Sequence, residues 1–244
     1  MVLRFEECNR QKNGNCTNLH NSEARLEKLA PLDKIGWLAD QSLDFRLWAA
    51  EAGRWRAFKA GQFVYHAGDP SDGLYGLGSG SLHLTFPLIA EEAVIIHRGE
   101  VGFWIGDNAE LATVPRLVSL AAATDCRLYY LPSSAVQGLL KEYPAHWRSF
   151  YALSAINVKV AVSQLSEVLA LSVRAGVCRR LLELSQSASV VDVTQEELAK
   201  LVGVTRGTLR RCLDDLEAMG ATEWRYRRLH ILNRETLAIY KDEQ

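Results

Sequence analysis

The chain has 244 residues, of which 48% are hydrophobic and 23% are charged, and its formal net charge is −1. This apolar content supplies a buried core and excludes a disordered chain, while the length allows one large domain or two smaller ones. No apolar run is long enough to span a bilayer, and the first residues lack the apolar core of a signal peptide. The five cysteines are scattered and odd in number, which does not fit a disulfide framework and predicts a cytoplasmic protein.

The first 52 residues are predicted to form a polar tail and a small helical lead-in. Apolar residues at helical spacing predict helices over Ser22–Leu29 and Leu32–Ala52, with a break at Pro31. Cys8 and Cys16 lie in the tail, and a redox pair between them is left open. Their number and spacing argue against an iron–sulfur cluster, which needs about four thiolates.

Between residues 53 and 143 the sequence changes to short β-prone runs separated by glycine and aspartate. Many short strands at this spacing predict a β-sandwich or barrel. A short helix is expected next, over Ser134–Lys141. The predicted strands are Arg54–Lys59, Phe63–His66, Leu74–Leu77, Ser81–Phe86, Ala93–His97, Val118–Ala123 and Arg127–Leu131.

Two apolar seams run along residues 144–171 at alternating spacings of three and four. One consists of Tyr151, Ala155, Val158, Val162, Leu165 and Leu169, and the other of Phe150, Leu153, Val160, Val168 and Leu171. A helix with two seams has two surfaces to bury, and we expect these to face the β-domain and a partner chain. The segment therefore predicts a dimerisation helix and a homodimer.

Residues 194–213, TQEELAKLVGVTRGTLRRCL, have the pattern of two short helices joined by a tight turn. Thr194 followed by Glu197 forms a capping box, and Gly203 tolerates the positive φ that a sharp reversal needs. Thr205 is placed to cap the second helix, whose leucines would be buried. The pattern predicts a helix-turn-helix.

The second of these helices has the chemistry of a DNA reader. Arg206, Arg210 and Arg211 lie near its start, and a guanidinium fork can bond two acceptors of a guanine or grip a phosphate. A helix over Val173–Ser187 and a strand over Val190–Val193 are expected before the motif. After it, strands over Ala221–Trp224 and Leu229–Leu232 would enclose Arg225 and Arg227 in a basic hairpin, which suggests a wing on the phosphates.

The order of these parts resembles the Crp/Fnr family of bacterial transcription regulators. The resemblance covers roughly residues 54–234 and is carried by Gly61–Leu82 and Thr194–Gly220. It implies an α+β fold with double-stranded operator DNA, a second copy of the chain and RNA polymerase as partners, and no membrane. The implied domains are a tail and lead-in (1–52), a jelly-roll, cyclic-nucleotide-binding-like effector domain (53–143), a dimerisation helix (144–171) and a winged helix-turn-helix domain (172–244).

Carried over residue by residue, the resemblance places base or phosphate contacts at Arg206 and Arg211 and phosphate-bonding hydroxyls at Thr205 and Thr208. Gly207 stands where many members have a glutamate that accepts from cytosine, so the usual operator is not implied, and Arg210 is an alternative contact. The full set of predicted DNA-binding residues is Thr194, Gln195, Thr205, Arg206, Gly207, Thr208, Arg210, Arg211, Arg225 and Arg227.

The effector pocket looks degenerate. Gly106 and Asp107 resemble the glycine–acid pair that holds a ribose in nucleotide-binding members, and Arg116 resembles their phosphate arginine. Leu117 replaces the hydroxyl residue of that motif, and Glu110 adds a negative charge nearby. An apolar side chain cannot bond a phosphate and an acid repels it, so this sequence argues against a cyclic nucleotide and leaves the effector open.

The alternatives for the β-domain are a small-molecule-binding jelly roll and a metal-dependent cupin-like enzyme. Such an enzyme needs a cluster such as two histidines and a carboxylate on facing strands. His83 and His97 are isolated, no His-x-His pair exists and no catalytic motif is present. Isolated histidines also argue against haem. The sequence therefore predicts a regulator that is not an enzyme and holds no metal.

Overall fold

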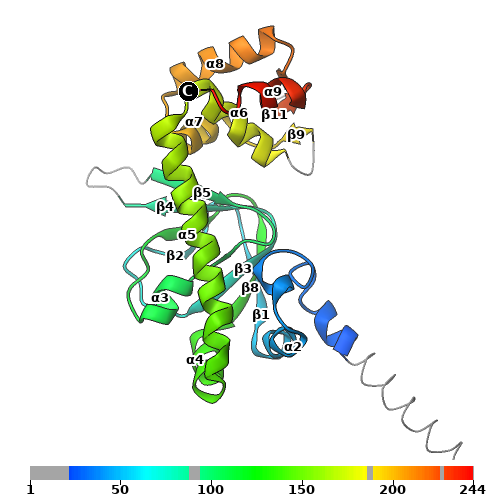
Figure 1. The fold of residues 1–244 in the computed structure, drawn as a ribbon, viewed down its shortest axis with the longest axis vertical. Coiled ribbons are helices and arrows are strands. Elements are labelled where there is room, and N and C mark those ends of the chain that lie inside the picture. Colours follow the sequence, from blue (N-terminus) through cyan, green and yellow to red (C-terminus); the bar gives the residue numbers. More distant parts are fainter. Residues whose placement is uncertain (1–21, 88–93, 186–188, 226–227, 244) are drawn as a thin grey trace, which may run out of the picture. The chain divides into compact units, whose positions relative to one another are not determined.

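The computed structural model describes residues 22–87, 94–185, 189–225 and 228–243 (Figure 1). The chain divides into two compact units, the first formed by residues 1–93 and 98–157 and the second by residues 94–97 and 158–244. Among the described residues, no helix is both long enough and apolar enough to cross a membrane.

The N-terminal lead-in of the first unit is helical only in pieces. Residues 22–27 are helical, followed by turns, the 3₁₀ helix η1 (Trp37–Asp40) and α2 (Leu43–Ala52). The prediction of one helix over Leu32–Ala52 is therefore wrong. Gly36 has φ 78°, and a Cβ at this position would lie 2.0 Å from the carbonyl oxygen of Gly102. This close approach requires a glycine in left-handed conformation, which a helix cannot contain.

The β-region forms two four-stranded sheets, ordered β1-β8-β3-β6 and β2-β7-β4-β5. Leu77 and Leu128 of the first sheet and Leu84 and Leu120 of the second share one buried cluster, so the two sheets form the predicted sandwich. The strands are β1 (Arg54–Phe58), β2 (Phe63–Tyr65), β3 (Gly73–Ser79), β4 (Leu82–Phe86), β5 (Val94–Gly99), β6 (Trp104–Ile105), β7 (Ser119–Ala122) and β8 (Cys126–Pro132). The two-residue β6 and the six-residue helix α3 (Asp107–Ala112) were not predicted.

After β8 the chain forms α4 (Ser133–Glu142), η2 (Pro144–His146) and the long helix α5 (Trp147–Ala170). Phe150 and Leu153 are buried against Trp37 and Phe45 in the core of the first unit. The other predicted seam, from Tyr151 to Leu169, is exposed in the single chain. In the second predicted seam Phe150 and Leu153 are buried, whereas Val168 is 75% exposed in the single chain.

The second unit carries the helix-turn-helix. Its core includes leucines from three of its helices, namely Leu181, Leu198 and Leu209. The strands are ordered β10-β11-β9, and α9 was not predicted. The elements are α6 (Val173–Leu184), β9 (Val190–Val191), α7 (Gln195–Val202), α8 (Arg206–Ala218), β10 (Thr222–Arg225), β11 (Arg228–Ile231) and α9 (Arg234–Tyr240).

Candidate nucleic-acid interface and effector pocket

The turn between α7 and α8 is built by local capping chemistry. The Thr194 hydroxyl accepts a hydrogen bond from the Glu197 amide at 3.1 Å. Gly203 ends α7 with φ 75°. The Thr205 hydroxyl accepts from the Thr208 amide at 3.2 Å and so caps α8. These two hydrogen bonds and the left-handed conformation of Gly203 confirm the predicted helix-turn-helix and define the start of α8.

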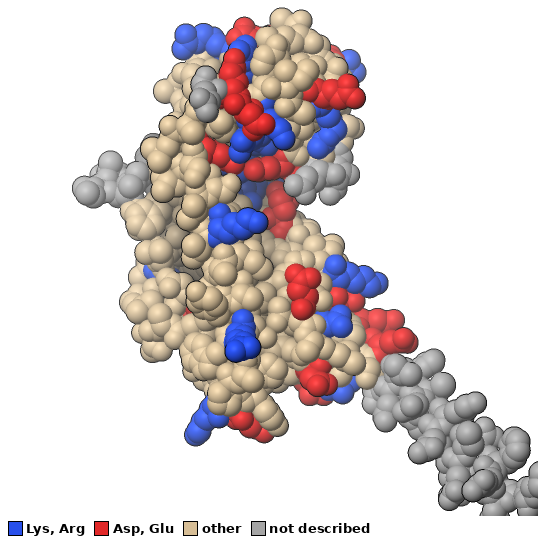
Figure 2. Space-filling view, viewed as in Figure 1, with Lys and Arg blue, Asp and Glu red and all other residues tan. Residues whose placement is uncertain are grey.

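Helix α8 buries its leucines and exposes its arginines. Leu209, Leu213 and Leu216 are buried together with Cys212, whereas Arg206, Arg210 and Arg211 are exposed. Figure 2 shows acidic and basic side chains interspersed over the unit that contains α8. Within α8 the basic residues gather in the first two turns and the acidic residues follow at Asp214 and Asp215. Arg210 lies 4.0 Å from Asp214 and Arg211 donates to the Gly207 carbonyl oxygen at 3.5 Å, but both side chains are exposed, so the start of the helix presents guanidinium groups that anionic DNA can reach.

The remaining predicted DNA contacts lie around α8. Gln195 opens α7 and lines a pocket of about 260 Å³ together with Arg210 and Trp224. Arg225 ends β10 and forms an ion pair with Glu223. Arg227 lies outside the described residues. Gln195 and Arg210 are thus brought together, and the roles predicted for the whole set stay predictions.

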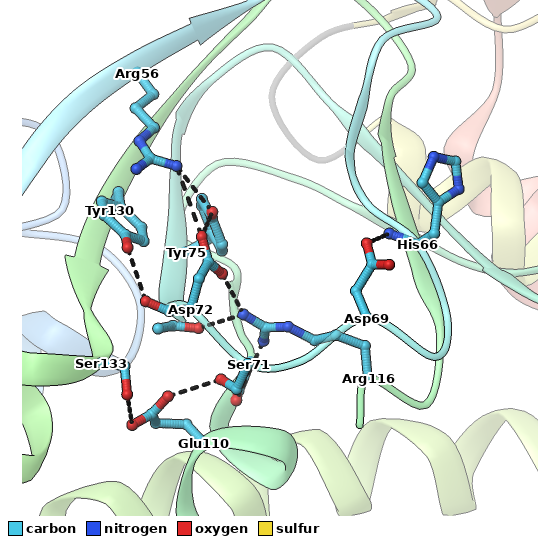
Figure 3. Close-up of polar contacts among 12 residues, drawn as sticks. Arg56, His66, Asp69, Ser71, Asp72, Tyr75, Glu110, Arg116, Tyr130 and Ser133 are labelled. Carbon is cyan, nitrogen blue, oxygen red and sulfur yellow. Dashed lines mark hydrogen bonds and ion pairs between the residues drawn. The ribbon is translucent and has the colours of Figure 1, made fainter. Parts of the chain in front are cut away.

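The predicted phosphate arginine of the effector pocket has an anionic partner within the protein (Figure 3). The Arg116 Nη2 donates to Asp72 Oδ1 and to the carbonyl oxygen of Gly73, each at 2.7 Å. The guanidinium carbon lies 4.3 Å from the centre of the Tyr65 ring, and the side chain is only 2% exposed. The positive charge is therefore neutralised by a carboxylate and covered by an aromatic face.

The carboxylate of Asp72 is itself held by a second donor. The Tyr75 hydroxyl donates to Asp72 Oδ2 at 2.6 Å, and burial together with this hydrogen bond raises the pKa of Tyr75, so the phenol stays neutral. Arg56 lies 3.8 Å from the same oxygen. Asp72 thus bridges the pocket arginine and the β3 tyrosine.

The two acidic residues of α3 also bind within the protein. Asp107 is buried and accepts from Ser154 Oγ at 2.6 Å and Asn157 Nδ2 at 2.8 Å, both on α5. The buried carboxylate of Glu110 accepts from the hydroxyls of Ser71 and Ser133 and from the amide of Gln137. Gly106 precedes them with φ 111°, and a Cβ there would lie 2.7 Å from Arg116 Nη1. Leu117 is 61% exposed.

Comparison with known proteins matches both parts of the chain. Residues 55–143 match the cyclic nucleotide-binding domain, and residues 177–240 match the Crp-like helix-turn-helix domain. The HTH-type transcriptional regulator Cmr of Mycobacterium tuberculosis is 28% identical over 170 residues, 69% of this chain and 68% of that protein. The CRP-like cAMP-activated global transcriptional regulator of the same organism is 25% identical over 174 residues, 67% of this chain and 77% of that one. The structure of FixK2 from Bradyrhizobium japonicum superposes with a TM-score of 0.69 at 16% identity, covering 79% of this chain and 98% of that one.

The chain belongs to the Crp/Fnr family of transcriptional regulators. Like other Crp/Fnr regulators it combines an effector-binding β-domain of the cyclic-nucleotide-binding kind, a long helix and a winged helix-turn-helix, which confirms the predicted α+β fold class. Its function is DNA-binding transcriptional regulation, in a family of regulators and not of enzymes.

Several residues that shape this Crp/Fnr pocket were missed in the sequence. Asp72 and Tyr65 both contact Arg116, and Asp72 lies 44 residues from it along the chain. In the sequence Asp72 has only the pattern of a turn residue before Gly73, so nothing near it in the chain indicates the contact with Arg116. Glu110 was expected to repel a phosphate, but it forms three hydrogen bonds to Ser71, Ser133 and Gln137.

Three of the five cysteines of this Crp/Fnr chain lie among the described residues. Cys126, Cys178 and Cys212 are buried, and burial raises the pKa of their thiols to about 11, 12 and 11. Cys8 and Cys16 lie outside the described residues. Over the ranges that the structure describes, no group of three histidine, cysteine or acidic residues is arranged to hold a metal ion.

Proposed function

We propose that this regulator binds operator DNA as a homodimer that is held together by α5. The observation that carries the proposal is the seam of Tyr151, Val158, Val162, Leu165 and Leu169, each more than half exposed in the single chain. An apolar stripe this long costs free energy in water and matches the spacing at which two helices pack. A second copy of the same helix is the complementary surface, and it would give the regulator two-fold symmetry.

In the proposed dimer the two α8 helices enter successive major grooves, about 34 Å apart. Arg206, Arg210 and Arg211 contact base edges or phosphates, because their guanidinium groups are exposed at the start of α8. The caps Thr205 and Thr194 and the adjacent Gln195 approach phosphates with the helix N-termini, and Thr208 adds a second hydroxyl. Gly207 offers no side-chain acceptor, and Arg225 and Arg227 contact the backbone from the wing.

We also infer that the β-domain does not respond to a cyclic nucleotide. One relative is named as cAMP-activated, but in this chain Arg116 binds Asp72, and Asp107 binds α5. Leu117 offers no hydroxyl to a phosphate. The pocket thus reacts to another small ligand or to none. Calorimetric titration with cyclic AMP should give no binding heat, and a micromolar isotherm would contradict this inference.

As a bacterial regulator of this family, the dimer is proposed to act in the cytoplasm and to contact RNA polymerase at promoters. The family membership supports this step. Genome-wide mapping of bound sites, combined with transcript changes in a deletion strain, would give the operator and the sign of regulation. Binding sites scattered without relation to promoters would contradict it.

The dimer is tested by placing acids in the α5 seam. The double substitution Val162→Asp, Leu165→Asp puts two charges on the exposed stripe, whereas Ser163→Asp adds one charge between stripe positions and serves as the control. Sedimentation equilibrium should show a dimer for the wild-type and control proteins and a monomer for the double variant. The double variant should also lose operator binding in fluorescence anisotropy. A wild-type monomer, or a double variant that remains dimeric, would refute the proposal.

A further inference from the structure

A surface cavity of about 520 Å³ in the second unit connects α8 with the start of α6 and the last described residues of the chain. Its lining includes Arg174 of α6 and the N-cap of that helix, Ser172, together with Thr208 and Arg211 of α8 and with Glu243. Thr208 and Arg211 are two of the residues proposed to contact DNA phosphates. A phosphate bound by both would therefore lie in or beside the same cavity.

The side chain of Glu243 already occupies the donors on the α6 side of this cavity. Arg174 donates from Nε to Glu243 Oε2 at 2.7 Å and from Nη2 to Oε1, so the guanidinium fork holds both oxygens. The Ser172 hydroxyl donates to Oε2 at 3.2 Å, and the Ser172 amide donates to the Glu243 carbonyl oxygen at 3.0 Å. About a third of each of the two charged side chains is exposed. The pair is thus open to solvent.

The donors that Glu243 uses are those that a phosphate uses. A forked arginine and a hydroxyl, here Arg174 and Ser172 at the start of α6, donate to the oxygens of carboxylates and phosphates alike. We propose that Glu243 is an intramolecular competitor of a DNA backbone phosphate, which keeps Arg174 from contacting the operator. The inference rests on the proposed function, since it adds Arg174 to the DNA interface built on α8.

The segment around Glu243 is anchored by contacts that do not involve the Glu243 carboxylate. The Arg179 Nε donates to the Lys241 carbonyl oxygen at 2.8 Å, and the same guanidinium pairs with Asp242 and with Glu167 of α5. The Tyr240 ring lies 4.7 Å from the guanidinium carbon of Arg174. Replacing the Glu243 carboxylate by an amide therefore leaves the segment attached. It removes the anion and keeps one carbonyl oxygen as an acceptor.

The experiment compares Glu243→Gln with Asp242→Asn in the full-length protein. Both substitutions remove one negative charge from neighbouring positions, but Asp242 pairs with Arg179 and is not part of the cavity lining. Operator binding is measured by fluorescence anisotropy between 50 and about 300 mM salt. One additional phosphate contact per protomer steepens the slope of log K against log salt by about 0.9 per half-site and about 1.8 for the dimer, and each contact is about an eightfold gain near 0.1 M salt.

We expect this gain for Glu243→Gln and not for Asp242→Asn. The double variant Arg174→Gln, Glu243→Gln should lose the gain, because the phosphate would then lack its arginine. An unchanged Glu243→Gln, an equal gain for Asp242→Asn, or a gain that survives the double substitution would each overturn the proposal. Absence of operator binding by the wild-type protein would instead contradict the proposed function. Non-specific duplex DNA measured in parallel should show the same steepening, since phosphates carry no sequence information.

Discussion

The substitution Asp72→Ala is expected to destabilise the β-domain and to expose an anion site at Arg116. The guanidinium of Arg116 is 2% exposed, and its hydrogen bond to Asp72 Oδ1 is 2.7 Å long. Without the carboxylate, a buried positive charge keeps only the carbonyl oxygens of Gly73 and Gly106 and the face of Tyr65. The Tyr75 hydroxyl loses its acceptor as well.

The expected loss of unfolding free energy depends on how deeply Arg116 and Asp72 are each buried. Removing one partner of a buried ion pair costs about 3–5 kcal/mol because the other charge is left without a partner. The side chain of Asp72 is 46% exposed, so water screens part of the interaction. We therefore expect a loss of about 2–3 kcal/mol for Asp72→Ala. Asp72→Asn should cost about half as much, because its amide oxygen still accepts from Arg116.

The assay is urea unfolding followed by tryptophan fluorescence, since Trp37, Trp55 and Trp104 all lie in the first unit. Asp69→Asn is the matched control: this residue lies in the same loop but accepts from the His66 amide. Added inorganic phosphate should then raise the stability of Asp72→Ala and leave the wild-type protein unchanged, because ligands stabilise the state they bind. Equal stability of Asp72→Ala and Asp69→Asn, or no response of Asp72→Ala to phosphate, would refute the reasoning.

Four further predictions follow from the described contacts. Glu110→Ala removes the acceptor of three hydrogen bonds and should lower the unfolding free energy of the β-domain by about 3 kcal/mol, measured by urea unfolding. Thr205→Ala removes the cap of α8 and should cost about 1 kcal/mol, which faster hydrogen exchange in the first turn of α8 would report. Burial lowers the pKa of His97 to about 4, so the folded state stays neutral while the unfolded state protonates, and stability should fall by up to about 3 kcal/mol as the pH drops from about 6.5 to 4. His97→Gln should flatten that dependence in pH-resolved unfolding. Since burial raises their thiol pKa values, Cys126, Cys178 and Cys212 should resist iodoacetamide at pH 8 in the native protein and react once it is unfolded, as peptide mass spectrometry would show.

The helix-turn-helix could be predicted from sequence because its determinants are local. Thr194, Gly203 and Thr205 each interact with a backbone group within four residues. The positions of these residues in the sequence therefore define where the two helices begin and end. The alternation of small β-prone runs with glycine likewise predicted the sandwich, since tight turns need particular residues. Both features can therefore be predicted without knowing any tertiary contact.

The predictions that were wrong or missing concern features that depend on contacts distant in the sequence or on very short elements. The break before η1 depends on the contact of Gly36 with Gly102, which is 66 positions away, and periodicity alone continued the helix through it. The buried residues of α5 are Phe150 and Leu153, and periodicity alone does not reveal where along a helix the contact with the chain's own core ends. The short elements β6 and α3 are smaller than the window over which periodicity can be recognised.

At the predicted effector site, residues of the type found in nucleotide-binding members bind other residues of the protein. Arg116 and Asp107 occupy the motif positions from which a ligand would be held, but they bind Asp72 and helix α5 respectively. The two hydrogen bonds that Asp107 accepts matter most, because their donors Ser154 and Asn157 lie on α5, and Asn157 also donates to the Trp104 carbonyl oxygen at 3.2 Å. Each oxygen of the Asp107 carboxylate accepts one of these hydrogen bonds from α5. We infer that a ligand which bound Asp107 only where these bonds are broken would favour the state in which α5 is released from α3, because a ligand shifts the population toward the state that it binds.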